Sequence, residues 1–164
     1  ELLCDYYHTR FGVDTRGVRF PGLISYGAPP GGGTTDWAVD IFYQARSTGR
    51  YTCFLGPESQ LDMMYMPDAI DALVGVMEAD PERLVHRNAF NVTAMQLTPT
   101  SLAAEIQKHI PDFEIDYDVD PVRQSIADSW PDRIDDSAAR EEWDWSPSFD
   151  AAAMTVDMLE HLTN

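Results

Sequence analysis

The sequence predicts a mixed α/β fold, and two observations lead to this prediction. Several segments repeat apolar residues at the spacing of an amphipathic helix, while the runs between them are short and have the composition of strands. Helical and strand-like segments alternate along the chain, as in α/β proteins. The chain has 164 residues, of which 44% are hydrophobic. This is enough for one moderate domain with its own core, or for part of a larger one.

The first predicted elements are a helix and a strand. The segment ELLCDYYHTRFG carries one apolar helical face and stops at Gly12, a typical helix-ending residue. Four residues form that face: Leu2, Leu3, Tyr6 and Tyr7. No capping residue precedes them, so we expect the tail of a longer helix and a cut end at Glu1. A β-type run covers residues 13–20, and Pro21-Gly22 is expected to end it and lead the chain out of the sheet.

The middle of the chain predicts two helices and two strands. One helix ends near Gly49 and has an apolar stripe: Trp37, Ala38, Ile41, Phe42 and Ala45. Short strands are expected at 51–55 and 61–66. Pro67 then opens a second helix, because proline is favoured in the first helical turn. Four residues recur on one face of this helix: Ile70, Leu73, Val74 and Met77.

The last part of the chain continues the alternation. NAFNVTA predicts a strand, and Thr98-Pro99 caps a helix. The buried side of that helix is expected to hold Leu102, Ala103, Ile106 and Ile110. Residues 113–117 alternate apolar and acidic side chains and predict a half-buried strand. Further helices are expected at 121–127, after Asp136 and over 150–162, the last with Met154, Met158 and Leu162 in register.

The charge and the cysteines limit the class of protein. The chain has 28 acidic and 11 basic residues and a net charge of −17, so it should repel nucleic acids and anionic membranes. No apolar run approaches the ~20 residues of a membrane span, and no segment resembles a signal peptide. Cys4 and Cys53 lack CxxC spacing and are expected to be reduced core thiols. The four histidines are scattered, so no metal site is predicted. We expect a soluble, cytoplasmic protein.

One loop stands out as a candidate binding element. The stretch PPGGGTTDWAVDIFYQA, residues 29–45, places three glycines and two threonines in front of a predicted helix. Backbone amides at a helix start favour an anion, and glycines allow a ligand to approach closely. No lysine follows, so a phosphate-binding P-loop is not indicated. The alternative is a plain turn that ends in a Thr or Asp cap.

Four stretches together resemble one protein family. They are RFPGLISYGAPPGGGTTDWAVDIFYQA, MMYMPDAIDALVGVMEA, FNVTAMQLTPTSLAAEIQKHIPDF and VDPVRQSIADSWPDRIDDSAAREEWDW. In this order they resemble the C-terminal half of the L-threonine 3-dehydrogenases of the extended short-chain dehydrogenase/reductase family, which is related to the nucleotide-sugar epimerases. The glycine-threonine loop and RQSIADSWP are specific for the threonine dehydrogenase branch. DDSAAREEWDW identifies only the superfamily.

The resemblance implies the C-terminal part of a Rossmann-type fold with a smaller α/β substrate-binding domain. Residues 1–25 would end the dinucleotide-binding domain, as the tail of the catalytic helix and the strand after it. Residues 26–164 would form mainly the substrate-binding domain, with 62–95 returning to the Rossmann sheet. Tyr65 and Asp68 resemble the junction between the two domains, and a structural role is expected for both.

The resemblance also implies a reaction and a cofactor. In the family, NAD⁺ accepts a hydride from the β-carbon of L-threonine, which becomes 2-amino-3-oxobutyrate. A Tyr-x-x-x-Lys pair supplies the general base and holds the cofactor ribose. This pair and the glycine-rich NAD fingerprint would lie upstream of Glu1, so no catalytic residue is assigned in this chain. Extended members commonly pair through the catalytic helix, so a homodimer is expected.

The site residues implied by the resemblance fall into three groups. The backbone that contacts the nicotinamide carboxamide is expected at Pro21, Gly22 and Leu23. The loop that binds the amino-acid end of L-threonine is expected at Gly33, Thr34 and Thr35. Trp130 is expected to be an apolar lid that excludes water, or else an ordinary packing residue. Arg123 and Asp128 flank the lid at a spacing that a surface ion pair would bridge.

Two alternatives remain open at this point. The first is a nucleotide-sugar epimerase or dehydratase, whose diphosphate substrate needs cationic groups. The region offers mainly Arg123, Arg133 and Arg140. The second is a noncatalytic interaction module without the cofactor half, which would use the apolar face of residues 2–7 to bind a partner.

Overall fold

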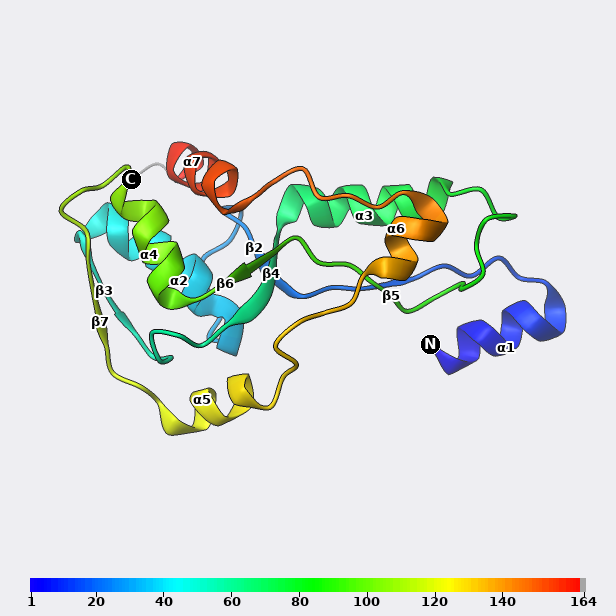
Figure 1. Ribbon diagram of the computed structural model, residues 1–164, viewed down its shortest axis with the longest axis horizontal. Coiled ribbons are helices and arrows are strands. Elements are labelled where there is room, and N and C mark those ends of the chain that lie inside the picture. Colours follow the sequence, from blue (N-terminus) through cyan, green and yellow to red (C-terminus); the bar gives the residue numbers. More distant parts are fainter. Residues whose placement is uncertain (163–164) are drawn as a thin grey trace.

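The structure, a computed structural model, describes residues 1–162 and has the predicted mixed α/β fold. Most of the short strands run along the middle of an elongated molecule, one strand pair lies at an edge, and helices lie at both ends (Figure 1). Three helices gather at one end: α2 (Trp37–Ser47), α4 (Pro99–Gln107) and α7 (Ala151–His161). Two more lie at the other end: α3 (Met66–Glu78) and α6 (Ser137–Trp143). None of the helices in residues 1–162 is long and apolar enough to cross a membrane.

Strand β4 (Leu61–Tyr65) is the centre of a three-stranded sheet. It pairs in parallel with β2 (Gly22–Ile24) and antiparallel with β6 (Met95–Leu97). All five β4 residues are buried, as expected for a central strand covered on both faces. Among the described residues, β2 has a strand partner on one edge only. The sheet therefore brings three distant parts of the chain together around β4.

The first strand ends before Pro21-Gly22 as predicted, but the chain joins a second sheet at once. The run over residues 13–20 forms only the short strand β1 (Val18–Arg19), which pairs with β5 (Phe90–Asn91). The chain then re-enters a sheet at β2, beside β4. Pro21 has no N–H to donate and separates the two strands. The proline thus marks a change of strand partner rather than the end of pairing.

The larger core lies under α2, α4 and α7, and the predicted stripes of these helices mostly face it. Its buried side chains include Trp37, Phe42, Leu102, Ile106, Met154 and Met158. At the edge of this core, β3 (Arg50–Cys53) pairs in parallel with β7 (Glu114–Tyr117). Thr98 caps α4 as predicted, since its hydroxyl accepts the Ser101 N–H at 3.0 Å. The short helix α5 (Pro121–Asp128) follows β7.

A smaller core forms at the other end of the molecule, between α3, α6 and the β1–β5 pair. It contains Met64, Phe90, Trp143 and Trp145 among its buried side chains. Segments 18–23 and 64–94 contribute to it, together with α6 and the residues that follow. The predicted domain boundary at residue 25 stays a prediction, and the packing adds α6 to the segments around this core.

Helix α3 begins beside Pro67 as predicted, but it packs with an unexpected face. Its buried residues are Asp68, Ala69, Ala72 and Val76. The apolar face that the sequence pattern predicted lies at the surface instead. Its four residues are 44–71% exposed: Ile70, Leu73, Val74 and Met77. Alanines let the helix lie close to the smaller core, while Arg16 donates to the C-terminal carbonyls of Val76 and Ala79 at 2.8 and 2.6 Å. The larger apolar side chains therefore form a face that residues 1–162 leave uncovered.

Tyr65 and Asp68 join strand β4 to the end of the chain. The Tyr65 hydroxyl donates to Asp157 Oδ2 in α7 at 2.5 Å. The Asp68 carboxylate is 1% exposed and accepts the N–H groups of Ser148 and Phe149 at 2.8 and 3.1 Å. Burial, together with the nearby Asp157 carboxylate, raises the pKa of Tyr65, so the phenol keeps its proton. Both side chains have the structural role that was expected.

Helix α1 (Leu2–Phe11) ends at Gly12 as predicted, with φ of +68° at the glycine. None of its residues is buried. The Thr15 hydroxyl donates to the Cys4 carbonyl at 3.1 Å and Arg19 pairs with Glu1, which ties the helix to the β1 region. Cys4 is only half-buried, unlike the predicted core thiol, while Cys53 is buried. Both cysteines are free.

Gly22 allows β2, β4 and the 3-10 turn η1 (Thr34–Asp36) to meet. A β-carbon at Gly22 would lie 2.5 Å from Met63 Sδ and 2.8 Å from the Thr35 methyl. Met63 is the register partner of Gly22 and is fully buried, so it has little room to move. A glycine is required here because any side chain would push the three elements apart.

We expect Gly22→Ala to lower the free energy of unfolding by about 1–3 kcal/mol, because the added methyl overpacks the site. Chemical denaturation of the purified protein measures the loss. Gly17→Ala is the matched control, since a β-carbon there would be 3.7 Å from its nearest neighbour. Equal stability of the two variants would contradict the close approach at Gly22.

Candidate substrate site

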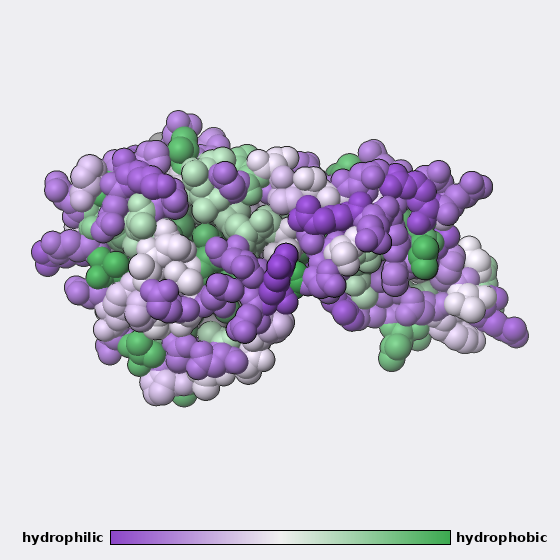
Figure 2. All heavy atoms as spheres, viewed as in Figure 1, coloured by the Kyte–Doolittle hydropathy of each residue, from purple (hydrophilic) through white to green (hydrophobic). Residues whose placement is uncertain are grey.

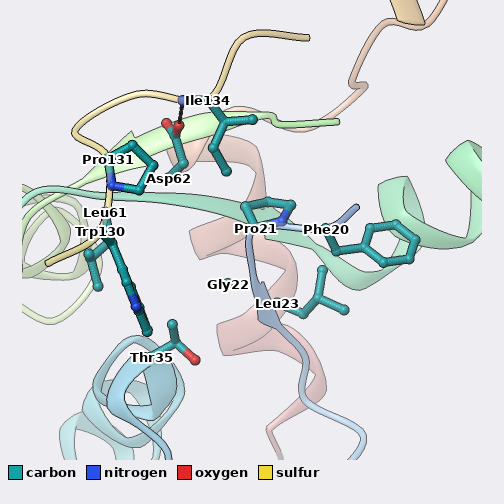
Figure 3. A pocket seen from close by; sticks show the side chains of 10 residues that line it. All are labelled: Phe20, Pro21, Gly22, Leu23, Thr35, Leu61, Asp62, Trp130, Pro131 and Ile134. Atoms are coloured by element: carbon teal, nitrogen blue, oxygen red, sulfur yellow. Dashed lines mark hydrogen bonds between the residues drawn. The ribbon is translucent and has the colours of Figure 1, made fainter. Parts of the chain in front are cut away.

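A cavity of about 330 Å³ opens between β2, β4, η1 and the segment after α5. Figure 3 shows the residues from Phe20 to Leu23 on one side, with Trp130 and Pro131 opposite them. Thr35 lies at one end, and Asp62 and Ile134 lie at the other. The lining is mainly apolar with a few polar groups, as in small-molecule sites.

The structure brings five of the seven predicted site residues to this cavity. They are Pro21, Gly22, Leu23, Thr35 and Trp130. Their binding roles stay predictions. Gly33 and Thr34 precede Thr35 in the chain but lie outside the lining. The sequence grouped all three loop residues, whereas the 3-10 turn directs only one of them into the cavity.

Thr35 is positioned by packing and leaves its hydroxyl available. Its methyl lies against Gly22, at the point where a β-carbon of that residue would otherwise be. The hydroxyl makes no hydrogen bond to any of residues 1–162. A threonine hydroxyl is one donor and also an acceptor, so it suits either the carboxylate or the ammonium group of an amino acid. Among the residues that line the described cavity, Thr35 is the one with a side-chain hydroxyl.

Two amides of the glycine-rich loop, those of Gly32 and Gly33, are already occupied and are not free for an anion. The Asp36 carboxylate accepts the N–H groups of Gly32 and Gly33 through Oδ2, at 2.6 and 2.8 Å. The negative charge at this corner is therefore supplied by the chain itself. Asp36 closes the loop into a turn, as in the alternative interpretation, and this turn fixes the neighbouring Thr35.

The wall formed by Pro21, Gly22 and Leu23 fits one end of the expected cofactor. Gly22 exposes backbone without a side chain, and the apolar Phe20 and Leu23 flank it. A nicotinamide ring needs an apolar surface with a backbone partner for its carboxamide, and this wall supplies both kinds of group. The sequence contains no Gly-x-Gly-x-x-Gly loop for the pyrophosphate. The fit is therefore limited to the nicotinamide end.

Trp130 lies in residues 129–135, which we call the Trp130 segment. The backbone N–H of Trp130 donates to the Ala127 carbonyl at the end of α5, at 3.1 Å. Farther on, the side-chain amides of Gln60 and Gln96 both donate to the Asp132 carbonyl at 3.1 Å. The indole itself is 40% exposed. The backbone is thus held on both sides, while the side chain covers one flank of the cavity.

Arg123 and Asp128 do not form the ion pair that their spacing suggested. The Arg123 guanidinium lies over the Phe54 ring, 4.2 Å from its centroid, and 3.8 Å from Asp120. Asp128 accepts a hydrogen bond from Gln124 Nε2 at 2.6 Å. The aromatic ring of Phe54, distant in sequence, is the partner of Arg123 instead.

Asp62 is a cavity residue that the sequence analysis missed. It stands in the fully buried strand β4 and is 8% exposed. Its carboxylate accepts the Ile134 N–H. Burial raises the pKa of Asp62, and the hydrogen bond from Ile134 opposes the shift. An acidic residue within an otherwise apolar strand, LDMMY, was the signal that could have found it.

The arginines named for a diphosphate do not converge on the cavity. Arg140 pairs with Asp136 at 2.8 Å, and Arg133 lies with it along a neighbouring groove that shares Asp62 and Ile134 with the cavity. No lysine or arginine is among the residues that line the cavity. In residues 1–162, no cluster of three or more His, Cys, Asp or Glu side chains could hold a metal ion. The cavity therefore offers polar but not cationic contacts.

Comparisons with known proteins agree with this architecture. No protein-family model matches the chain. An uncharacterised epimerase/dehydratase of Staphylococcus haemolyticus is 59% identical over 160 residues, which are 98% of this chain and 50% of that protein. The solved L-threonine dehydrogenase of Clostridium difficile is 61% identical with a TM-score of 0.94, over 97% of this chain and 50% of that one.

Two further structures place these similarities in a wider context. The GalE-like L-threonine dehydrogenase of Cupriavidus necator is 50% identical, with a TM-score of 0.93, over 98% of this chain and 58% of that one. A UDP-glucuronic acid 4-epimerase of Bacillus cereus, solved with NAD, has a TM-score of 0.73 over 99% of this chain and 50% of that one. At 17% identity, the epimerase shares the fold alone.

The chain spans about half the length of these relatives. The similarity extends over nearly all of its residues, and the related structures have the same arrangement of strands and helices. The chain belongs to the GalE-like L-threonine dehydrogenase and epimerase/dehydratase family, of which it represents the C-terminal half.

Proposed function

We propose that the chain is the substrate-binding portion of an NAD-dependent L-threonine 3-dehydrogenase, which oxidises L-threonine to 2-amino-3-oxobutyrate. One observation carries the proposal. The cavity brings the Thr35 hydroxyl, the Gly22 backbone and the Trp130 indole together, in a chain 61% identical to part of a solved L-threonine dehydrogenase. A cavity of about 330 Å³ suits an amino acid beside a nicotinamide ring.

The residues of this chain would bind and orient the substrate. Thr35 would hydrogen-bond the carboxylate or ammonium group of L-threonine through its hydroxyl. Pro21, Gly22 and Leu23 would hold the nicotinamide end of NAD⁺, which supplies the hydride acceptor when bound. Trp130 and Pro131 would exclude water from the reacting atoms.

No residue of the chain is proposed as the general base. Asp62 is the one titratable side chain in the cavity lining, and its carboxylate is turned to the Ile134 N–H (Figure 3). Tyr65, the nearest buried phenol in β4, donates to Asp157 instead. A base has to reach the proton that it removes. The chemistry is therefore assigned to the other half of the family architecture.

A nucleotide-sugar epimerase or dehydratase is the second candidate, supported by the name of the Staphylococcus haemolyticus relative. A diphosphate needs cationic partners, and no lysine or arginine lines the described cavity. A lining without cationic side chains favours a small amino acid over a nucleotide sugar.

We also propose that the complete protein is a homodimer in which α1 takes part. Helix α1 exposes five large apolar side chains by 49–87%: Leu2, Leu3, Tyr6, Tyr7 and Phe11. Figure 2 shows hydrophobic residues at the surface at this end of the molecule, among mostly hydrophilic neighbours. Contiguous apolar faces of this kind mark interaction surfaces. In the alternative of a noncatalytic module, the same face would bind a different protein.

The activity is tested with a chimera in which this chain follows the N-terminal half of the Clostridium difficile L-threonine dehydrogenase. We expect NADH absorbance with L-threonine and NAD⁺, and none from the 164-residue chain alone, which lacks the Tyr-x-x-x-Lys and glycine-rich motifs. Thermal stabilisation by NAD⁺ verifies that the chimera is folded. A folded chimera that is stabilised by a UDP-sugar and not by L-threonine would favour the epimerase instead.

The role of Thr35 is tested by two substitutions in the active chimera. Thr35→Val keeps the methyl against Gly22 and removes the hydroxyl, so we expect KM for L-threonine to rise about tenfold, or roughly 1.4 kcal/mol. Thr35→Ser keeps the hydroxyl and should bind L-threonine more tightly than Thr35→Val. Steady-state kinetics also give the KM for NAD⁺, which should stay nearly constant. An equal rise of both KM values would show that the loop is assigned wrongly.

The dimer is tested by sedimentation of the chimera and of its Tyr6→Glu variant. A charge in an apolar interface is costly to bury, so the variant should dissociate to monomers at concentrations where the parent is dimeric. Glu78→Gln, at the end of α3, serves as a surface control. A variant that remains dimeric would exclude this face from the interface.

A further inference from the structure

Asp62 and Gln96 act together on the Trp130 segment. They are register partners on the antiparallel strands β4 and β6, so their side chains lie on the same face of the sheet. Asp62 accepts the N–H of Ile134, and Gln96 donates to the carbonyl of Asp132. One acceptor and one donor thus hold two consecutive peptide groups of the segment, on either side of Arg133.

The energetic cost of Asp62 indicates that this contact matters. A carboxylate that is 8% exposed loses most of its hydration, and an apolar residue at this position of β4 would avoid that loss. The hydrogen bond from the Ile134 N–H offsets part of this loss of hydration free energy. The other side chains of the strand are apolar or aromatic and fill the two cores. Packing alone therefore does not explain an acid at this position.

The contact lies at the end of the cavity opposite Thr35 (Figure 3). Trp130 and Ile134 belong to the same short segment, and both line the cavity. Gln60 strengthens the attachment through a second hydrogen bond to the Asp132 carbonyl, at 3.1 Å. Asn91 adds a further bond to the Asp135 carbonyl at 3.2 Å. These bonds hold the segment backbone at Asp132, Ile134 and Asp135, next to the Trp130 indole that lines the cavity.

We propose that Asp62 is a positioning residue that sets substrate affinity by holding the Trp130 segment over the cavity through the Ile134 N–H. The inference rests on the proposed function for its kinetic part. Asp62 is not a catalytic residue, because its carboxylate is engaged with the segment backbone. Its acceptor oxygen matters here more than its charge, and a neutral amide oxygen can take its place.

The test compares Asp62→Leu, which has no acceptor, with Asp62→Asn, which keeps one. In the folded chimera, Asp62→Leu should raise KM for L-threonine about tenfold, or roughly 1.4 kcal/mol, and leave the KM for NAD⁺ unchanged. Asp62→Asn should stay near the parent. In a Trp130→Ala background, Asp62→Leu should add less than about twofold, because coupled residues are not additive. Asp128→Leu is the control, since that carboxylate accepts a hydrogen bond from Gln124 within α5.

A second measurement does not depend on activity. Hydrogen exchange of the Ile134 amide should accelerate in Asp62→Leu and stay slow in Asp62→Asn, with no substrate present. Slow exchange in both variants would overturn the inference, even if the protein oxidises L-threonine. An unchanged KM in Asp62→Leu, or a full effect in the Trp130→Ala background, would also overturn it. If exchange accelerates in Asp62→Leu but the chimera does not oxidise L-threonine, the proposed function is rejected, while the role of Asp62 in holding the Trp130 segment is supported.

Discussion

The contact of the Thr35 methyl with the Gly22 backbone, above the buried Met63 side chain, is the constraint on which the cavity depends. It joins three segments that are distant in sequence, at a separation that leaves no room for a β-carbon. Strand β4 makes the contact possible, because Met63 supports Gly22 while Asp62 reaches the opposite end of the cavity. The walls of the site are therefore set by the pairing of one strand.

The same geometry decides what kind of ligand the cavity suits. Asp36 occupies the Gly32 and Gly33 amides of the glycine-rich loop with its own carboxylate, so these two amides serve to form the turn before Thr35. The remaining contacts are a hydroxyl, backbone groups and aromatic surface. Such contacts discriminate through hydrogen-bond geometry and shape, which favours a small zwitterion over a highly charged substrate.

Much of the fold could be predicted from the sequence, and the failures have physical causes. Helices α2 and α7 each carry a single apolar stripe, so periodicity identifies both the helix and its buried face. Helix α3 is apolar on two sides, and small alanines rather than the larger residues face the core. The partner change at Pro21 and the buried role of Asp62 depend on contacts between distant segments. Local patterns do not contain such contacts.

The cavity separates binding from chemistry. Its hydroxyl, backbone and indole groups can hold and enclose a substrate, yet its one titratable side chain is already engaged with the Trp130 segment. Around it, α1 and α3 expose apolar faces, and β2 has one edge without a strand partner among residues 1–162. These are surfaces that a further folded unit would cover. A proton acceptor brought by that unit would meet a substrate that this chain has already positioned.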